Sequence, residues 1–288
     1  MKNAIVSFIK SSIETNGYRG GVVGISGGID SAVVAALAVE AVGKERVLGI
    51  LLPERDSSPD TRKDSLVVCD YLGIERIESP ITKALKALGV YRLEPSPRLV
   101  PRSIQERYVR DRIESIGSDD AFLKDLRNEG DKSFLRGLAF YRSKHRVRMV
   151  RLYLEAEQRN YAVIGTTNRT ETATGFYVKY GDDSSDIEPI AHLYKTQVYE
   201  LAREMGIPER IRDKAPSPDL LPGVTDEQML GMSYRDLDAI LMRMDHEQGL
   251  GGMDDEKVER VKRIIEAAKT RKVRNLALFP GQDARRSE

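Results

Sequence analysis

The chain has 288 residues, of which 40% are hydrophobic and 32% charged, so it has the composition of a soluble globular protein and the length for one large α/β domain or two small ones. Its 46 Lys and Arg residues balance 45 Asp and Glu residues, which argues against a dedicated nucleic-acid-binding protein. A single cysteine excludes an internal disulfide, and no apolar run is typical of a signal peptide or a membrane span. We therefore expect a cytoplasmic protein that associates with neither nucleic acid nor membrane.

The first part of the chain alternates predicted helices and buried strands. Ser58 and Pro59 are typical of a helix start, and Cys69 lies on an amphipathic segment where core packing is expected. Such alternation predicts βαβ units and a parallel sheet. The expected helices are 2–16, 30–42 and 58–72, and the expected strands are 21–25, 46–52 and 74–81.

The middle and the C-terminal part of the chain are predicted to be mainly helical. Residues 91–135 read as a charged insertion, with a proline-containing loop at 91–101 and short helices within 103–131. A fourth buried strand is expected at 161–165. The remaining expected helices are 132–158, with apolar Leu138, Val147, Val150 and Leu154 on one side, 195–205, 226–230, 233–245 and 254–269.

These elements predict one domain over residues 1–288, with 226–288 as a helical C-terminal part. The expected fold class is α/β, a Rossmann-like three-layer sandwich built on a parallel sheet.

A strand that leads through a glycine-rich turn into a helix is the strongest local signal in the sequence. It reads Gly24-Ile25-Ser26-Gly27-Gly28-Ile29-Asp30-Ser31. Paired glycines permit positive φ, and a helix N-terminus favours an anion, so this loop is expected to hold phosphates. A carboxylate at Asp30 makes sense if Mg²⁺ lies between it and the phosphates. The plainer alternative is an ordinary strand-to-helix turn with Asp30 as an N-cap.

The eight-residue string resembles the signature of the ATP pyrophosphatases, which split ATP into AMP and pyrophosphate while adenylating an oxygen. Further strings resemble the NAD synthetase family in order and spacing. They are Gly165-Thr166-Thr167-Asn168-Arg169-Thr170-Glu171, Gly175-Phe176-Tyr177-Val178-Lys179-Tyr180-Gly181-Asp182, Asp186-Ile187-Glu188-Pro189-Ile190, Leu193-Tyr194-Lys195-Thr196 and Lys214-Ala215-Pro216-Ser217.

The resemblance implies an ATP-dependent amide ligase. ATP, the co-substrate, would adenylate the carboxylate of deamido-NAD, and ammonia would then displace AMP to give NAD.

The resemblance also implies the roles of individual residues. Residues 24–31 with Thr166, Lys195 and Ser217 would contact ATP, and Asp30 and Glu171 would hold Mg²⁺. Arg146, Lys179 and Asp186 would contact deamido-NAD. Asp30, Lys179, Asp182 and Lys195 are the expected catalytic residues, with Asp182 as a hypothetical proton acceptor from ammonium.

Four features depart from the family pattern. Val178 stands where threonine is usual, Asp183-Ser184-Ser185 replaces small glycine-rich residues, and the family's substrate-contacting C-terminal segment is not recognisable in 270–275. The insertion within 91–135 is longer and more charged than expected. Ligation of another carboxylate by a paralogue therefore remains an alternative.

Two other functions stay open at this point, namely a tRNA-modifying ATP pyrophosphatase and a non-catalytic adenine-nucleotide sensor. The resemblance further implies a homodimer. Nitrogen would come from ammonia itself or from a separate glutaminase partner, since the expected domain has no glutaminase part.

Overall fold

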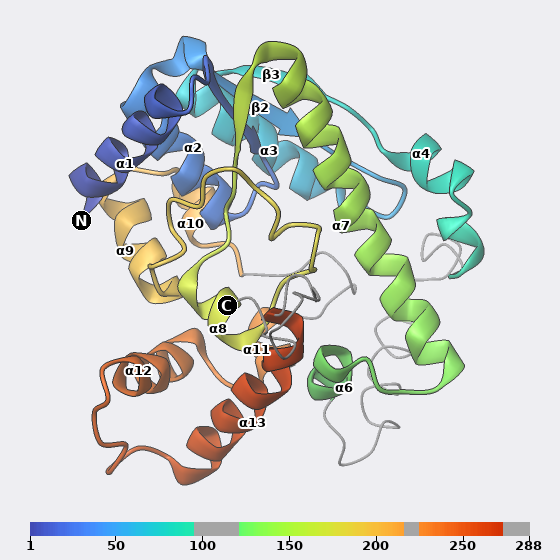
Figure 1. Ribbon diagram of the computed structural model, residues 1–288, viewed down its shortest axis with the longest axis vertical. Helices are drawn as coiled ribbons and strands as arrows, with labels where there is room; N and C mark the ends of the chain where they lie inside the picture. The colour runs from blue at the N-terminus through green and yellow to red at the C-terminus, as the bar shows by residue number, and fades with distance from the viewer. Residues whose placement is uncertain (95–120, 216–224, 273–288) are drawn as a thin grey trace, which may run out of the picture.

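A computed structural model describes residues 1–94, 121–215 and 225–272. Its centre is a four-stranded parallel sheet in the order β3-β2-β1-β4 (Figure 1). The strands are β1 (Gly20–Gly24), β2 (Val47–Leu51), β3 (Glu75–Glu78) and β4 (Tyr161–Ile164). Val22 in β1 lies opposite Leu48 in β2 and Val163 in β4, so the carboxyl ends of the central strands meet at one edge of the sheet.

The strands alternate side chains between two apolar layers, as a pleated strand requires. Val23 and Ile164 face the core that also holds α1 (Lys2–Thr15), α2 (Ile29–Val42), α3 (Pro59–Leu72), α9 (Lys195–Glu204) and α10 (Glu209–Arg212). Val22 and Val163 face the opposite side, where they pack against α7 (Lys132–Arg159). This gives the predicted three layers and confirms the α/β parallel-sheet fold class.

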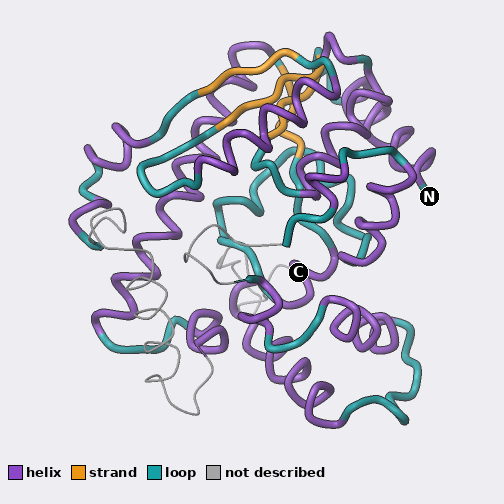
Figure 2. The backbone as a smooth tube through the Cα atoms, turned by 180° about the vertical axis from the view of Figure 1, so that it is seen from behind, coloured by secondary structure: helices purple, strands orange, loops and turns teal. Residues whose placement is uncertain are grey.

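A second apolar cluster lies beyond the carboxyl edge of the sheet, in the lower part of Figure 1. Its largest members include Phe122, Leu237 and Ile264. Figure 2, which shows the molecule from behind, also places this group of helices below the sheet. The helices that build it are α6 (Ala121–Arg127), α8 (Arg169–Thr174), α11 (Asp226–Leu230), α12 (Tyr234–Asp245) and α13 (Asp255–Lys272).

The predicted elements are found with small changes at their ends. Ser58 caps α3 by accepting the N–H of Asp60, with Pro59 in the first turn, and Cys69 is fully buried as expected. The third strand is shorter than the predicted 74–81. Short helices α4 (Thr82–Ala87), α8 and α10 lie where no helix was predicted.

The apolar side of α7 behaves differently from expectation. Leu138 is buried, but 60% of Val150 and 50% of Leu154 are exposed. Half or more of each of these two side chains is therefore open to solvent in the described part of the chain. No helix among the described residues is both long and apolar enough to cross a membrane. The predictions for 95–120, Ser217 and 273–275 fall outside the described residues.

Candidate active site

The predicted phosphate loop connects the carboxyl end of β1 to the first turn of α2. Gly28 is the N-cap of α2, and Asp30 lies in its first turn. The buried Ser31 hydroxyl donates to the Gly28 carbonyl (2.9 Å) and accepts the Ser26 N–H (3.3 Å). The loop is thus folded back onto the helix, whose unpaired N–H groups face its mouth. Such a helix end attracts anions such as phosphate.

Helix α3 forms the back wall of this loop. The hydroxyl of Ser65 donates to the carbonyl of Ile25 (2.9 Å). Gly27 has a φ of 72°, and a Cβ on it would lie only 2.8 Å from the Cβ of Asp64. Glycine is required at this position both by its backbone conformation and by the space available.

The buried carboxylate of Asp64 is itself held by two cations from a distant segment. Arg210 Nε lies 2.6 Å from Asp64 Oδ1, and Lys214 Nζ lies 2.9 Å from Asp64 Oδ2. These ion pairs connect the back of the phosphate loop to the beginning of the Lys214-Ala215-Pro216-Ser217 string. Local sequence patterns did not predict these contacts, because the partners are 146 and 150 positions apart.

A lysine and two carboxylates meet in front of the loop. Lys195 Nζ lies 2.5 Å from Asp30 Oδ2, and the lysine is 2% exposed. Asn168 donates to Asp30 Oδ1 (3.0 Å), and its backbone N–H donates to Glu171 Oε2 (3.0 Å) in a capping box at the start of α8. The structure therefore brings together Asp30, Glu171 and Lys195, which are up to 165 positions apart.

The charges of these groups depend on one another. Desolvation raises the pKa of Glu171 well above its usual value, and the nearby Asp30 carboxylate raises it further. Desolvation alone would lower the pKa of Lys195, but Asp30 and Glu171 outweigh it and raise the pKa. The cluster thus keeps its lysine charged and leaves Glu171 short of positive charge.

The loop after β4 carries the next group of predicted residues. Thr166 follows the strand by two positions, and the hydroxyl of Thr167 donates to the carbonyl of Asp182 (3.2 Å). Asp182 accepts the Val178 N–H (2.7 Å) on one oxygen and lies 3.4 Å from His145 Nδ1 with the other. Partial desolvation would raise the pKa of Asp182, although 42% of its side chain is exposed. His145 and the Val178 N–H outweigh that effect and lower the pKa.

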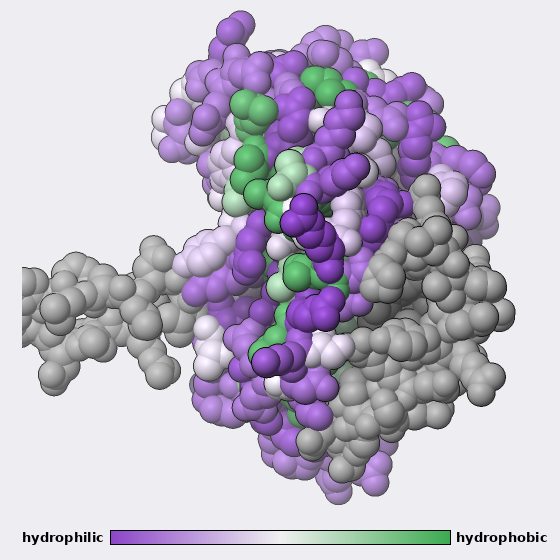
Figure 3. Space-filling view, turned by 90° about the vertical axis from the view of Figure 1, so that its right-hand side faces the viewer, coloured by the Kyte–Doolittle hydropathy of each residue, from purple (hydrophilic) through white to green (hydrophobic). Residues whose placement is uncertain are grey.

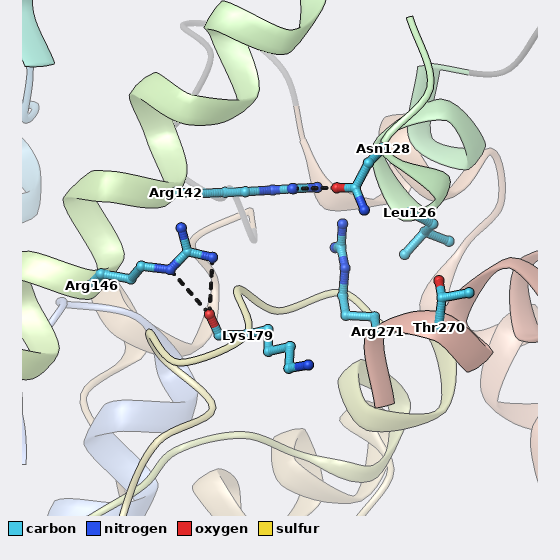
Figure 4. A pocket seen from close by; sticks show the side chains of 7 residues that line it. All are labelled: Leu126, Asn128, Arg142, Arg146, Lys179, Thr270 and Arg271. Carbon is cyan, nitrogen blue, oxygen red and sulfur yellow. Dashed lines mark hydrogen bonds between the residues drawn. The ribbon is translucent and has the colours of Figure 1, made fainter. Parts of the chain in front are cut away.

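A cationic pocket of about 200 Å³ opens between α6, α7, α13 and the loop that carries Lys179 (Figure 4). Arg146 donates from Nε and Nη2 to the Lys179 carbonyl (3.2 Å each). Figure 4 shows the guanidinium groups of Arg142 and Arg271 converging close to Asn128. The lining residues are Leu126, Asn128, Arg142, Arg146, Lys179, Thr270 and Arg271. We name this site the cationic pocket.

Two of the three residues predicted to contact deamido-NAD, Arg146 and Lys179, line the cationic pocket, and the third does not. Asp186 accepts the Val163 N–H (2.7 Å) at the edge of β4 and a hydrogen bond from Tyr153 (3.3 Å). In this structure the Asp186 carboxylate therefore hydrogen-bonds to the backbone of the edge strand β4. Arg142 and Arg271, which also line the pocket, were not among the predicted site residues.

A phosphate loop at the carboxyl edge of a parallel sheet, followed by a lysine–carboxylate cluster and a cationic pocket, defines a nucleotide-binding α/β enzyme of the ATP pyrophosphatase type. Comparison with known proteins agrees with this class. The NAD synthase family model matches residues 1–116 and 112–275. The chain therefore belongs to the NAD synthase family.

Individual relatives support the same assignment. The chain is 57% identical over 266 residues to the NH(3)-dependent NAD(+) synthetase of Thermotoga maritima, covering 92% of this chain and 94% of the relative. It is 42% identical over 245 residues to that of Coprothermobacter proteolyticus, with 82% of each chain covered.

Solved structures are similar over most of their length. NMN synthetase from Francisella tularensis aligns with a TM-score of 0.72 and 28% identity over 98% of this chain and 97% of that one. NAD+ synthetase from Burkholderia pseudomallei aligns with a TM-score of 0.60 and 27% identity over 94% and 87%.

Proposed function

We propose that this protein is an ATP-dependent amide ligase that converts deamido-NAD and ammonia to NAD, with AMP and pyrophosphate as the other products. The observation that carries the proposal is the pair of Lys195 and Asp30 beside Glu171 at the mouth of the phosphate loop. A nucleotide sensor has no need of a buried lysine placed against two carboxylates in front of the phosphates. An enzyme that expels pyrophosphate needs such charge stabilisation.

ATP binds with its phosphates in the loop formed by residues 24–31. Ser26 and the first turn of α2 face the phosphates, the buried Ser31 hydroxyl supports the loop from within, and Thr166 contacts the nucleotide at the end of β4. Lys195 stabilises the charge that develops as pyrophosphate leaves, because its ammonium group stays protonated. Ser217 is assigned to the same phosphates from the sequence.

The carboxylates of Asp30 and Glu171 suit Mg²⁺, which is usually bound by one or two carboxylates together with substrate phosphates. Burial first, and the Asp30 carboxylate second, raise the pKa of Glu171 despite the nearby Lys195, so a further cation beside the two carboxylates would stabilise their charged forms. Among the described residues no group of three His, Cys, Asp or Glu side chains could hold a metal ion. When bound, Mg²⁺ would neutralise charge on the phosphate oxygens.

The acid substrate lies with its anionic groups in the cationic pocket. Arg146 fixes the backbone of Lys179, so the two cations act as one unit at the substrate. Asp186 is assigned to the same substrate from the sequence alone, since its carboxylate accepts hydrogen bonds from the edge of β4 and from Tyr153. This arrangement holds the substrate carboxylate within reach of the α-phosphate, which is the positioning that adenylation requires.

Ammonia then attacks the carbonyl carbon of the adenylate. A C–N bond forms, the C–O bond to AMP breaks, and AMP leaves with the electron pair. Ammonium must first lose a proton, and Asp182 accepts it as an ionised carboxylate between the loop after β4 and the cationic pocket. After the attack the new amide nitrogen loses a second proton as AMP leaves, and both protons end in solvent.

Pyrophosphate release measured with ATP, Mg²⁺ and ammonium tests this proposal. Strict dependence on deamido-NAD is expected. Nicotinic acid mononucleotide is the second acid to compare, because the structural similarity extends to an NMN synthetase. Preference for the mononucleotide would change the assigned substrate but leave the assignment as an ATP-dependent amide ligase intact. Release that ignores both acids would refute the assignment of deamido-NAD.

Two matched variants test the role of Asp30. Asp30→Asn should abolish turnover, since the residue lies against Lys195 in the first turn of α2. Asp60→Asn is the control, because Asp60 occupies the first turn of α3 but is exposed and pairs with Lys63 at the surface. Equal activity of both variants would contradict the assignment of Asp30 to the metal and phosphates.

We also propose that the protein acts as a cytoplasmic homodimer and that residues 1–288 form one domain. The single domain is supported by the packing of α12 against α9 and of α13 against α8. The dimer is supported by the exposed Val150 and Leu154 on α7; Figure 3 shows this side of the molecule, with apolar patches among hydrophilic surface. Ammonia is supplied free or by a separate glutaminase.

Sedimentation of the wild type and of Val150→Glu tests the dimer. A dimeric wild type and a monomeric variant are expected, and a dimer unaffected by the charge would move the interface elsewhere.

A further inference from the structure

The wall of the cationic pocket contains one carboxylate that two guanidinium groups share. Asp125 lies near the end of α6, at the C-terminal end of the charged insertion. Arg142 Nη2 donates to Asp125 Oδ1 (2.8 Å), and Arg271 donates to Asp125 Oδ2 from Nη1 and Nη2 (3.2 Å each). Both arginines also donate to the backbone carbonyl of Asp125 (2.8 Å). Arg142 of α7 and Arg271 of α13 therefore meet at one residue of the segment that was predicted to be an insertion.

Asp125 is fully occupied and largely removed from water. Its side chain is 11% exposed, and those of Arg142 and Arg271 are 16% and 7% exposed. The buried hydroxyl of Tyr141 donates a further hydrogen bond to Asp125 Oδ1 (2.5 Å). Burial first, and the Asp125 charge second, raise the pKa of Tyr141, so this phenol remains a donor. An arrangement with so many charged hydrogen bonds has a single preferred geometry.

Arg271 connects Asp125 to the loop that contains Lys179. Its Nη1 donates to the carbonyls of Gly175 (2.9 Å) and Tyr177 (3.2 Å). The second of these lies two residues before Lys179, whose own carbonyl is held by Arg146. The backbone around Lys179 is thus fixed from two sides, by α7 through Arg146 and by α13 through Arg271.

The charge balance of the pocket depends on the same carboxylate. Arg142, Arg146, Lys179 and Arg271 are cations, and none of the other lining residues is acidic. Asp125 bonds directly to two of the four cations. Without its charge, Arg142 and Arg271 would repel one another at the pocket wall. The remaining excess of positive charge suits an anionic substrate rather than a neutral one.

We propose that Asp125 is a positioning residue for the acid substrate, because it sets Arg142 and Arg271 in the pocket wall and through Arg271 fixes the backbone that carries Lys179. The proposal rests on the proposed function of the cationic pocket. It assigns to α6, α7 and α13 a joint part in placing the substrate.

Steady-state kinetics of Asp125→Asn, Asp125→Glu and Arg271→Gln test the proposal, with KM determined separately for deamido-NAD and for ATP. Asp125→Asn and Arg271→Gln should each raise the KM for deamido-NAD about tenfold, the order expected when a charge-assisted hydrogen bond is lost. The KM for ATP should stay within about twofold, because the phosphate loop is held by other contacts. Asp125→Glu keeps the charge and should lie closer to the wild type than Asp125→Asn.

A matched control separates this role from general loosening of α13. Asp236→Asn removes the ion pair with Lys257 (2.7 Å), which also attaches α13 to its neighbour but lies away from the pocket. It should leave both KM values unchanged. The double variant of Asp125→Asn with Arg271→Gln should raise the KM for deamido-NAD by less than the product of the two single effects, since Asp125 acts in part through that arginine.

Equal rises in both KM values, no change in KM for deamido-NAD, or full additivity in the double variant would overturn the proposal. If Asp125→Asn fails to fold, Arg271→Gln carries the test, because it leaves Asp125 bonded to Arg142 and Tyr141. The wild type is assayed first with deamido-NAD and with nicotinic acid mononucleotide. A wild type that prefers the second acid refutes the proposed substrate, and the same KM comparison made with that acid still decides the role of Asp125.

Discussion

Replacing Gly27 by alanine tests how tightly the phosphate loop is built. The residue has a φ of 72°, in the left-handed region that residues with a Cβ avoid. A Cβ at this position would meet Asp64 Cβ at 2.8 Å, Thr61 O at 2.9 Å and Ser65 N at 3.0 Å. These atoms cannot move away easily, because two are backbone atoms of α3 and the third belongs to a buried side chain.

The expected cost combines two independent effects. A left-handed conformation costs a residue with a Cβ about 1–2 kcal/mol. Overpacking at a rigid site costs about 1–3 kcal/mol more. The free energy of unfolding of Gly27→Ala should therefore fall by about 2–5 kcal/mol, unless the loop moves away from α3. Such a movement would displace the phosphate-binding groups and raise the KM for ATP instead.

Urea unfolding and the KM for ATP, measured together, check this prediction, and Gly28→Ala is the matched control. Gly28 has a φ of −91°, and a Cβ there would meet only the Ser26 hydroxyl at 3.2 Å, which can rotate. The control should lose about 1 kcal/mol or less, the cost of alanine in place of glycine at an N-cap. A Gly27→Ala protein with wild-type stability and a wild-type KM for ATP would refute the close packing of the loop on α3.

Three further predictions concern buried groups near the site. Lys195→Met leaves Asp30 and Glu171 without their cation and should lower the free energy of unfolding by about 3–5 kcal/mol, as for other broken buried pairs. Arg62→Met, which breaks an exposed pair with Glu78, is the control and should not shift the urea midpoint. Equal effects of the two variants would contradict the argument from burial. Burial raises the pKa of Cys69 to about 11, so its thiol should react with a disulfide reagent at pH 8 only as fast as the protein unfolds; rapid labelling in the absence of urea would show that the thiol is accessible. Burial would raise the pKa of Asp64, but Lys214 and Arg210 outweigh it and lower the pKa. The stability that these two ion pairs add to the folded protein is therefore present above the unfolded pKa of about 3.9, and it is lost as pH falls through the lower folded pKa. The stability difference between the wild type and Asp64→Asn should shrink over that acid range in thermal melts, and a constant difference would exclude the ion pairs as its source.

The sequence predicted the sheet, the main helices and the phosphate loop because their signals are local. Alternating apolar segments, a capping serine at Ser58 and the paired glycines at 27 and 28 each act within a few residues. Helix α8 was missed for a related reason. Its capping box between Asn168 and Glu171 is visible in the sequence, but the helix is short and has no apolar period to support it.

The contacts that complete the site could not be derived from local patterns. Asn168 reaches Asp30 across 138 positions, and Arg271 reaches Asp125 across 146. Nothing in the local sequence distinguishes such an arginine from one on a solvated helix face. Val150 and Leu154 on α7 show the opposite error, because their apolar spacing predicted a buried face and the structure leaves both side chains half or more exposed. Apolar spacing indicates a helix face but does not say what covers it.

Two buried charged side chains, Asp125 and Lys144, each bind two partners of opposite charge, and stability alone does not explain them. Asp125 binds two arginines, and Lys144 binds both Glu54 and Asp56 at 3.0 Å where α7 meets the loop after β2. Such buried ionic groups cost desolvation, and apolar replacements of similar size are often as stable. Each of them fixes one geometry between segments that lie far apart in the chain. Placement of ATP and the acid substrate relative to one another requires such a fixed geometry, because a misplacement of about 1 Å can slow a reaction by about a hundredfold.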